Sequence, residues 1–432
     1  MKVRESLIGL EKMTKVRSFI FDVITRKYQH CDEPQFYQYS TSVRNQKSKI
    51  SSTGSGFSFI SEKVAKIKCI SEAFERKACE DFNLKDLIRS PYKNLSPENT
   101  LNPQIFIPFS ADQLKVKRNS KLFIKETDIF YWGKVINLAD KKEYLIPAQL
   151  IYTKFIDKNE KIIRFPISTG AAANFSLDSA LYNGICEIVE RDSFMIMYLN
   201  KVCRSRINLR LIKDSRIQKI LLKAKRYFLD VYMFDITSNL NIPSFLCVVI
   251  DNSGYGLSVS TGLKSDLDPV VAMLGSLQEA FHTRSWIRSC VENGDINPEI
   301  KADEISSIKD RGAFWFKVNQ IKNLNFLLNL PEKRYVFDKK IPVDDLSKLS
   351  IAANTIYKQD MHIYYKDLTA KELKGFNYYV VKVIIPELQP LYLNDRYPYL
   401  GNKRIYTVPV ELDLLKQPHD VSELNMYPHP FL

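Results

Sequence analysis

The chain contains little glycine, and this shortage limits how it can bind a nucleotide. Only 14 of its 432 residues are glycine. Neither a G-x-x-x-x-G-K-[ST] loop nor a strand-linked G-x-G-x-x-G motif occurs. The two glycines in STGSGFSF, Gly54 and Gly56, match neither pattern. Any nucleotide is therefore not held by a Walker-type loop.

Clustered metal ligands and long apolar runs are also lacking. The seven cysteines include no C-x-x-C pair and the five histidines are scattered, so a structural zinc site is not expected. The longest apolar runs, such as FMIMYL, fall far short of the roughly 18 residues that a membrane-spanning helix needs. The N-terminal segment MKVRESLIGLEKMTKVRSF has no signal-peptide core. We therefore expect a cytoplasmic protein without membrane association.

What the chain does have is bulk and positive charge. A content of 45% hydrophobic and 26% charged residues excludes a chain that is disordered throughout. Lys and Arg number 63 against 49 Asp and Glu, a net charge of +14, which favours anionic partners such as nucleotides, nucleic acids or acidic peptides. Nucleic-acid binding ranks last, because no block of clustered Lys and Arg with interleaved aromatic residues occurs.

Beyond residue 50 the chain alternates between strand-like and helix-like blocks. Runs rich in β-branched and aromatic residues predict strands at 144–155, 231–236, 245–250 and 378–385. Apolar periodicity predicts helices at 61–80, 176–200, 211–227 and 268–289. For residues 1–50 we predict a short helix and a loose connection, and for the polar residues 292–311 a surface insertion.

One charged motif, E-x-x-E-R, occurs twice. Its copies are Glu72, Glu75 and Arg76, and Glu187, Glu190 and Arg191. In a helix, residues three and four apart share a face, so each copy presents two carboxylates and a guanidinium together. The first copy lies largely off an apolar stripe, and taken alone it is most simply a solvated face with ion pairs.

The second copy lies in a different setting, because apolar residues surround it on nearly every side. Such a helix is buried, and charges there must be paired or bind a metal. A structural ion-pair network is one possibility. The other pools the four carboxylates and two arginines: open carboxylates suit Mg²⁺, and arginine forks suit phosphate oxygens. The chemistry indicated is metal-assisted phosphoryl transfer.

These segments resemble the motifs of YcaO-domain proteins. The matching stretches are KCISEAFERKA, STGAAANFSLDSALYNGICEIVERDSF, DPVVAMLGSLQEAFHTR, IIPELQPLYL, PYLGNKRIYTVPV and PHPFL. The third is a helix with acidic and amide positions that ends in arginine. The resemblance implies a YcaO domain over residues 51–432, preceded by a variable N-terminal segment at 1–50. It also implies an α+β fold of the YcaO type, with mixed and antiparallel sheets and helices that form an ATP site.

The resemblance also assigns site residues. The metal ligands for Mg²⁺-ATP are Glu72, Glu75, Glu187 and Glu190. Phosphate-site or scaffold roles are implied for Arg76 and Arg191, and a supporting role for Arg284. The family often has Asn and Glu at the positions of Phe175 and Ser179. Asn174 and Asp178 stand one residue earlier, a rotation of about 100° on a helix, so these two candidates for cofactor binding are not automatic replacements.

The implied activity is that of azoline-forming cyclodehydratases in the biosynthesis of ribosomal peptide natural products such as bacteriocins. In these enzymes a Cys, Ser or Thr side chain of the precursor peptide attacks the preceding carbonyl. The oxyanion takes the γ-phosphoryl group of ATP, and loss of phosphate gives a thiazoline or oxazoline. Two alternatives stay open: a YcaO enzyme that installs a thioamide or amidine, and a catalytically silent scaffold that binds a partner or peptide.

The last five residues resemble the proline-alternating tail of the azoline-forming members, with Leu432 in place of a final proline. Because alternating prolines stiffen a chain, Pro428 and Pro430 can place the terminal carboxylate of Leu432 in the site, and we expect a catalytic role for all three. A frayed terminus is the alternative. About 50 residues before the YcaO region are too few for a domain that binds the precursor's leader. We therefore expect a separate scaffold similar to ubiquitin-activating enzymes. A flavin dehydrogenase in the same complex and a homodimer are further partners that the resemblance admits.

Overall fold

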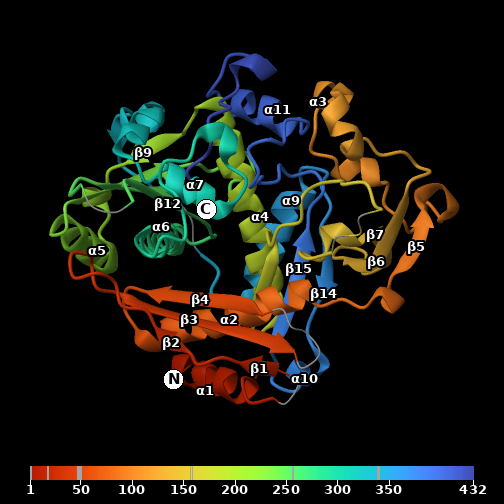
Figure 1. Cartoon of the computed structure of the whole chain (residues 1–432), viewed down its shortest axis with the longest axis horizontal. Helices are drawn as coiled ribbons and strands as arrows, with labels where there is room; N and C mark the ends of the chain where they lie inside the picture. Colours follow the sequence, from red (N-terminus) through yellow and green to blue (C-terminus); the bar gives the residue numbers. More distant parts are fainter. Residues whose placement is uncertain are drawn as a thin grey trace. The chain divides into compact units, whose positions relative to one another are not determined.

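The computed structural model describes residues 2–16, 19–45, 51–155, 157, 159–254, 257–337 and 341–432. It contains two compact units (Figure 1). Unit 1 comprises Met1–Lys27, Tyr37–Ile188 and Pro342–Leu388, and unit 2 comprises Tyr28–Phe36, Val189–Ile341 and Gln389–Leu432. Within the described ranges, every helix is too short or too polar to cross a bilayer.

The first sheet of unit 1 is antiparallel and is built around β3. Its strands are β1 (Phe19–Phe21), β2 (Thr25–Arg26), β3 (Tyr37–Asn45) and β4 (Ser52–Ser58). Helix α2 (Glu62–Glu80) lies on β3 and β4, and α1 (Lys2–Met13) packs against α2 (Figure 1). A Cβ atom on Gly54 would lie 2.2 Å from the Cys69 carbonyl oxygen, and one on Gly56 would lie 1.9 Å from that of Ala65. These two glycines therefore let the helix approach the sheet closely.

The loose connection expected in residues 1–50 is wrong for residues 37–45, which form β3. Alternate residues of this strand, Tyr39, Thr41 and Val43, are buried, and this is the period of two that a half-buried strand requires. The many Gln and Ser residues obscured that period. The short helix is confirmed as α1, whereas residues 46–50 lie outside the described ranges.

The second sheet of unit 1 carries the strand that becomes important for the site, β15. Its strands are β5 (Ile88–Pro91), β6 (Ile129–Asn137), β7 (Glu143–Pro147), β8 (Ala171–Asn174), β14 (Tyr364–Asp367) and β15 (Tyr379–Ile384). Among described residues the order is β5-β6-β14-β15-β8, and β7 also pairs with β6. The strand predicted at 378–385 is confirmed. The one predicted at 144–155 is wrong from Ala148 onward, where the buried chain forms a 3₁₀ turn instead.

Three further helices belong to unit 1, namely α3 (Ala111–Lys115), α9 (Asp345–Tyr357) and α10 (Lys371–Lys374).

Unit 2 contains one described sheet, with helices α5 (Ser215–Lys225) and α6 (Pro269–Glu292) packed on it. Its strands are β9 (Ser205–Ile207), β10 (Leu229–Asp235), β11 (Ser244–Asp251), β12 (Val259–Ser265) and β13 (Glu332–Lys333). The order is β12-β11-β10-β9-β13, and the described pairs are antiparallel except for β9 with β13. The strands predicted at 231–236 and 245–250 and the helices predicted at 211–227 and 268–289 are confirmed.

Three shorter helices complete unit 2: α7 (Ile308–Phe314), α8 (Asn325–Leu328) and α11 (Arg404–Glu411). The predicted surface insertion at 292–311 holds for its largely exposed first part. It is wrong at the end, because Ile305 and Arg311 are fully buried and α7 begins at Ile308.

Helix α4 (Leu177–Asn200) begins in unit 1 and ends in unit 2. It is buried along almost its whole length, as its apolar surroundings in the sequence predicted. It carries the second E-x-x-E-R copy, so the charged groups of that copy sit on the most buried long helix of the described chain.

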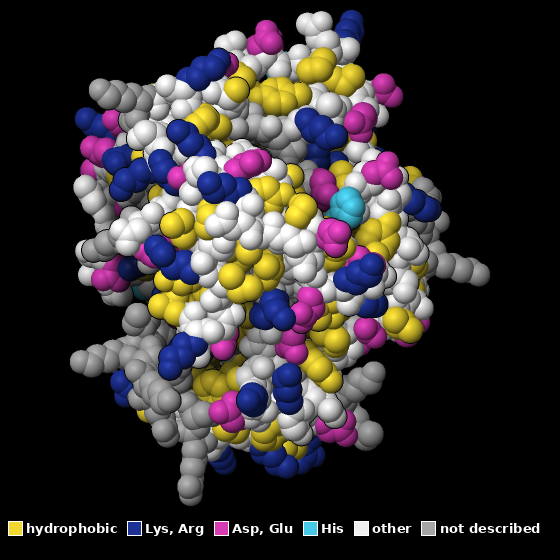
Figure 2. All heavy atoms as spheres, turned by 90° about the vertical axis from the view of Figure 1, so that its right-hand side faces the viewer, with side chains coloured by type: hydrophobic (Ala, Val, Ile, Leu, Met, Phe, Trp, Pro, Cys, Tyr) yellow, Lys and Arg dark blue, Asp and Glu magenta, His cyan; other side chains and the backbone are white. Residues whose placement is uncertain are grey.

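Positive charge is spread rather than concentrated on the face drawn in Figure 2. There the Lys and Arg side chains of the described residues are interspersed with Asp, Glu and apolar side chains. This distribution agrees with the low rank that the sequence gives to nucleic-acid binding.

Candidate functional site

Helix α2 holds the first motif copy at a surface that is only partly open. Arg76 Nη2 lies 2.7 Å from Glu72 Oε1, and the Ser55 backbone N–H donates to Glu72 Oε2 at 2.5 Å. The Arg76 side chain is 47% exposed and that of Glu72 is 29% exposed. The ion pair predicted for this copy is therefore present, and β4 fixes the second carboxylate oxygen.

Two further carboxylates of unit 1, those of Glu75 and Glu187, lie close to Glu72. Burial raises the pKa of Glu75 well above its usual value, and the negative charges of Glu187 and Glu72 raise it further. Burial also raises the pKa of Glu72. The Gly170 backbone N–H donates to Glu187 Oε2 at 3.2 Å. This concentration of negative charge disfavours full ionisation, and a bound cation would relieve it.

The second half of α4 presents a related cluster within unit 2. Glu190 Oε2 accepts a hydrogen bond from the Ser265 backbone N–H at 3.1 Å. The Arg191 guanidinium lies 3.5 Å from Glu190 Oε1 and 3.9 Å from Glu279 Oε1. Burial raises the pKa of Glu279 to about 8, although the charge of Arg191 opposes this shift. Glu279 was not assigned a role from the sequence, although the resemblance had marked an acidic position in this helix.

Arg284 lies in a buried ion-pair network of unit 2. Its Nε and Nη2 donate to the Glu33 carboxylate at 2.9 and 2.7 Å. Its Nη2 also donates to Asp251 Oδ2 at 2.6 Å, and its Nη1 donates to the Leu257 carbonyl oxygen at 2.7 Å. A guanidinium has five N–H donors in all, so this side chain is largely committed to protein partners. The arrangement fits a supporting role better than direct contact with phosphate.

Asn174 and Asp178 are placed near the start of α4 and serve local structure. Asn174 Oδ1 accepts from the Phe175 backbone N–H at 2.7 Å, and Asp178 lies in the first turn of the helix. In the described chain, no hydrogen bond or ion pair joins either residue to the glutamates of the two clusters. Phe175 packs on Tyr378 with ring centroids 5.1 Å apart, which places it in the core.

The C-terminal residues 428–432 are held in place rather than frayed. Tyr198 Oη donates to the Pro428 carbonyl oxygen at 3.0 Å, and Thr261 Oγ1 donates to that of Pro430 at 2.9 Å. His429 Nε2 donates to the Tyr392 carbonyl oxygen at 2.8 Å. The Phe431 ring is 1% exposed, and the Arg191 guanidinium carbon lies 4.0 Å from its centroid. The alternative of a frayed terminus is therefore wrong, and the tail borders Arg191.

Burial of His429 in the C-terminal tail predicts that the free energy of unfolding depends on pH. Burial lowers the pKa of His429 well below its usual value, and the charge of Arg311 acts in the same direction. In the unfolded chain His429 takes up a proton as the pH falls below about 6.5. The unfolded state then binds more protons than the folded state, so the free energy of unfolding should decrease as the pH falls through this range.

Urea unfolding at about pH 7.5 and about pH 5.5, on either side of the ordinary histidine pKa, measures this effect. We expect His429→Gln to reduce the difference in stability between the two pH values, and His419→Gln, which changes a half-buried histidine, to leave it near that of the unchanged chain. An unaltered pH dependence in His429→Gln would contradict the assignment.

Lys382 is a further candidate site residue, which the sequence analysis did not assign. Its Nζ donates to the carbonyl oxygens of Ile167 and Thr169 at 2.8 and 2.6 Å, directly before the Gly170 N–H that holds Glu187. Burial lowers the pKa of Lys382 to about 8, and the charge of Glu187 opposes the shift. The available signal was a single charge within the apolar strand YYVVKVII.

The turn that Lys382 holds depends on a glycine. Gly170 has a φ of +86°, and a Cβ atom there would lie 2.3 Å from the Val383 carbonyl oxygen. Strand β15 thus fixes this turn through both the Lys382 side chain and the adjacent backbone. The Gly170 N–H of this turn then holds one carboxylate oxygen of Glu187.

For the nucleotide site that the resemblance implies, replacement of Lys382 should weaken nucleotide binding, although Lys382 itself is not expected to contact the nucleotide. In Lys382→Met two carbonyls lose their donor and the turn is free to shift. Loss of a group that orients a metal ligand typically costs about 10–100-fold in metal affinity, so we expect the dissociation constant for Mg²⁺-ATP to rise about tenfold or more. Lys366 lies opposite Lys382 on β14, and Lys366→Met is the matched control. Equal effects in the two variants, or no effect in either, would contradict the positioning role.

The chemistry of these donors fits Mg²⁺ bound to phosphate rather than a closed metal cage. In the described part of the chain, no three His, Cys, Asp or Glu side chains form a group that could hold a metal by themselves. Mg²⁺ is usually bound by one or two carboxylates together with waters and substrate phosphates. A backbone N–H fixes one carboxylate oxygen in each of Glu72, Glu187 and Glu190. The second oxygens of Glu72 and Glu190 lie beside Arg76 and Arg191, so carboxylates for Mg²⁺ and guanidinium groups for phosphate are neighbours here.

Comparison with known proteins decides the family. A family model described as "YcaO cyclodehydratase, ATP-ad Mg2+-binding" matches residues 57–389. The chain belongs to the YcaO family. ATP and Mg²⁺ are accordingly its cofactors. An uncharacterized protein of Methanothermobacter thermautotrophicus is 20% identical over 262 residues, which cover 60% of this chain and 65% of that protein. The chain thus spans slightly less than two thirds of this relative.

Solved structures show the same fold. A heterocyclase in complex with substrate and cofactor has a TM-score of 0.81 at 19% sequence identity. The match covers 99% of this chain and 57% of the heterocyclase chain. YcaO from Methanopyrus kandleri bound with AMPPCP and Mg²⁺ has a TM-score of 0.62 at 15% identity, with coverages of 89% and 91%. The E. coli microcin synthetase McbBCD complex with pro-MccB17 bound has a TM-score of 0.61 at 16% sequence identity. The match covers 84% of this chain and 88% of that chain. The α+β YcaO fold expected from the sequence is confirmed.

Proposed function

We propose that this YcaO protein is an ATP-dependent cyclodehydratase that converts Cys, Ser or Thr residues of a ribosomally made precursor peptide into thiazolines or oxazolines. The observation that carries the proposal is the pinned tail beside Arg191, because a tail of this type belongs to the azoline-forming members that the sequence resembles. Family membership and the likeness to a heterocyclase with a TM-score of 0.81 support it.

We assign the Mg²⁺-nucleotide to the four motif glutamates, Glu72, Glu75, Glu187 and Glu190. Glu187 and Glu190 lie three residues apart on α4, so they share a face of one continuous helix. The resemblance of both motif copies to those of the family is the reason to assign them to the same nucleotide. Arg76 and Arg191 are the candidates for phosphate contact. Arg284 supports the helix that carries Glu279. Asn174 and Asp178 lie near the N-terminal end of α4 and stabilise the local structure there.

The proposed reaction at this site has three stages, namely nucleophilic attack, phosphoryl transfer and loss of phosphate. The peptide nucleophile attacks the preceding carbonyl carbon, and the resulting oxyanion receives the γ-phosphoryl group, with ADP leaving. Loss of phosphate and a proton then gives the ring, so that one water is removed overall. Bound Mg²⁺ supplies charge neutralisation on the phosphates. We assign Arg191, which packs on the Phe431 ring, to stabilise the negative charge that develops on the phosphate oxygens.

The tail is assigned to the chemical step. Pro428 and Pro430 restrict the backbone, while Tyr198 and Thr261 fix their carbonyl oxygens at 3.0 and 2.9 Å. Leu432 follows directly after the ring that backs Arg191. We therefore assign Pro428, Pro430 and Leu432 to the positioning of the reacting amide, where small displacements have large effects.

The proposed partners are the precursor peptide and a leader-binding scaffold similar to ubiquitin-activating enzymes, in the cytoplasm. The likeness to the McbBCD complex with pro-MccB17 bound supports an assembly of this kind. A flavin dehydrogenase in the same complex and a homodimer are further proposals. A bacteriocin-like peptide would be the product.

Phosphate release and product mass, measured together, test this function. With precursor, scaffold, ATP and Mg²⁺, we expect one phosphate for each ring and a product lighter by one water for each modified residue. Omission of the scaffold should slow the reaction greatly, because the proposed scaffold is the component that binds the leader. A product in which sulfur replaces an amide oxygen would establish the thioamide alternative. Peptide binding without phosphate release would establish the silent scaffold. Either result would overturn the proposal.

A further inference from the structure

One cavity is lined wholly by residues of unit 2 and shares no lining residue with the glutamate clusters. Its volume is about 600 Å³, within the range of about 300–1,000 Å³ that is common for ligand pockets. The lining comes from β9, β10, the start of α6 and the segments 333–337 and 412–414. Its size and separate lining indicate a binding site that the proposed reaction does not use.

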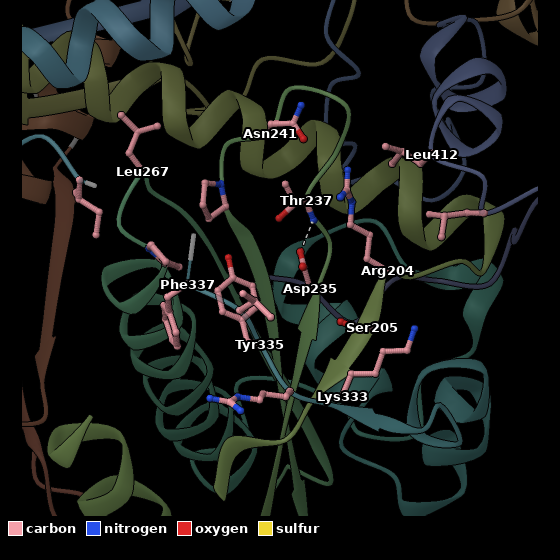
Figure 3. A pocket seen from close by; sticks show the side chains of 16 residues that line it. Arg204, Ser205, Asp235, Thr237, Asn241, Leu267, Lys333, Tyr335, Phe337 and Leu412 are labelled. Carbon is pink, nitrogen blue, oxygen red and sulfur yellow. Dashed lines mark hydrogen bonds between the residues drawn. The ribbon is translucent and has the colours of Figure 1, made fainter. Parts of the chain in front are cut away.

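The two sides of this cavity differ in chemistry (Figure 3). Arg204, Asp235 and Lys333 gather around Ser205 on one side, and Tyr335 and Phe337 lie on the opposite side. Leu267 and Leu412 add apolar surface at separate points of the wall. A ligand that fills the cavity must therefore present both charged and apolar groups.

The charged side is positive in balance. Lys333 and Arg334 are exposed, and together with Arg204 they outnumber Asp235, the acidic residue of the lining. Arg204 Nη2 donates to the Ser238 carbonyl oxygen at 3.3 Å. Its Nε is buried and has no hydrogen-bond partner among the described residues. A buried donor of this kind favours an incoming acceptor, above all a charged one.

The apolar side is a row of rings that leads from the core to the surface. The fully buried Phe245 contacts Tyr335 with centroids 5.3 Å apart, and Tyr335 contacts Phe337 at 5.0 Å. Phe337 is nevertheless 49% exposed, and its neighbour Val336 is 62% exposed. The row holds an exposed ring in one orientation, and such preorganised aromatic surface is typical of peptide contacts.

Asp235 distinguishes between the anionic ligands that could bind here. The Asp235 carboxylate would repel a polyphosphate, whereas an acidic peptide brings a backbone N–H donor for Asp235 as well as side-chain carboxylates for Arg204. One oxygen of Asp235 already accepts from the Thr237 N–H at 3.0 Å. The mixture of Arg204, Lys333 and Asp235 therefore suits a peptide backbone with acidic side chains better than a nucleotide.

We propose that this cavity binds an extended peptide segment in which acidic side chains flank an apolar or aromatic one. The carboxylates pair with Arg204 and Lys333, a backbone N–H faces Asp235, and the apolar side chain packs on Tyr335 and Phe337. Binding of this kind needs neither nucleotide nor amide chemistry. Its presence or absence is thus measured independently of the proposed cyclodehydratase activity.

The test is fluorescence anisotropy with a labelled tetrapeptide, Glu-Leu-Phe-Glu, blocked at both ends, on the full chain without nucleotide. We expect saturable binding that ADP with Mg²⁺ does not displace. Peptides of the same length with Lys in place of Glu, or Ser in place of Leu and Phe, should bind at least tenfold more weakly. Equal binding of the Lys peptide, displacement by ADP, or no saturable binding would each overturn the proposal.

Variants locate the binding in the cavity. We expect Lys333→Glu and Phe337→Ala each to weaken binding about tenfold or more, a change that corresponds to the loss of one well-made contact. Both side chains are exposed, so the fold should tolerate their replacement. The matched controls on α5, Lys219→Glu and Leu222→Ala, should bind normally. Equal losses in the variants and controls would show a non-specific charge effect and would overturn the proposal. Arg204→Gln provides a further test, accepted only where its unfolding midpoint matches that of the unchanged chain.

Discussion

Replacing Glu187 or Glu190 with Gln should nearly abolish ATP use while the fold remains intact. Gln keeps the size of the side chain and can still accept the backbone hydrogen bonds from Gly170 or Ser265, but it has no charge for Mg²⁺. Losing a single charge-stabilising contact in a preorganised site costs about 10²-fold or more in rate. We expect this effect at both residues, and steady-state phosphate release measures it.

A control variant separates loss of a ligand from general damage. Glu62 lies on α2 and forms an exposed ion pair with Lys66, with 43% of its side chain accessible. Glu62→Gln should turn over ATP normally, because exposed pairs of this type contribute little. Thermal unfolding of the Glu187 and Glu190 variants should match that of the unchanged chain. Normal nucleotide affinity and turnover in both variants would remove the glutamates from the site.

Removal of residues 428–432 should strongly reduce azoline formation, with a much smaller effect on nucleotide affinity. The segment is buried against Tyr198, Thr261 and Arg191. If it positions the reacting amide, its loss affects the chemical step, where misplacement by about 1 Å costs about 10²-fold. Product mass and calorimetric nucleotide binding, measured on the same preparation, test this expectation.

A milder variant distinguishes stiffness of the tail from the contact with Arg191. Pro428→Ala combined with Pro430→Ala leaves Phe431 in the chain and removes only the backbone restriction. We expect a loss of azoline formation smaller than that of the deletion and unchanged nucleotide binding. Loss of nucleotide affinity in parallel with product formation would make the tail a structural part of the nucleotide site. No change in either measurement would remove its catalytic role.

The long helices were predictable because their pattern is local. Apolar periodicity placed α2, α4 and α6 within a few residues of their observed ends, since each has several turns in which one face is buried. The short strands β2 and β13 span two residues each, and two residues carry no period. Their pairing with β3 and β9 depends on segments far away in the chain, which local patterns do not reveal.

The same distinction applies to the site. The E-x-x-E-R spacing is a property of a single helix, so the motif can be found in the amino-acid sequence, whereas the roles proposed for Glu72 and Glu187 come from the resemblance to the family. The partners that hold these residues are backbone groups of Ser55 and Gly170, which have no side-chain signature. Lys382 belongs to the same class, because it acts on carbonyl oxygens of a distant turn. Sequence motifs therefore indicate candidate ligands more readily than the groups that orient them.

The most direct test of the central claim follows the oxygen atom of the modified amide. A precursor peptide is prepared with heavy oxygen in the backbone carbonyl before the reacting Cys, and the phosphate released from ATP is examined by mass spectrometry. If the oxyanion takes the γ-phosphoryl group, the amide oxygen leaves with the phosphate, and each phosphate formed with a ring must carry one heavy oxygen. Unlabelled phosphate, released while the peptide closes its rings or remains unchanged, would contradict phosphorylation of the amide.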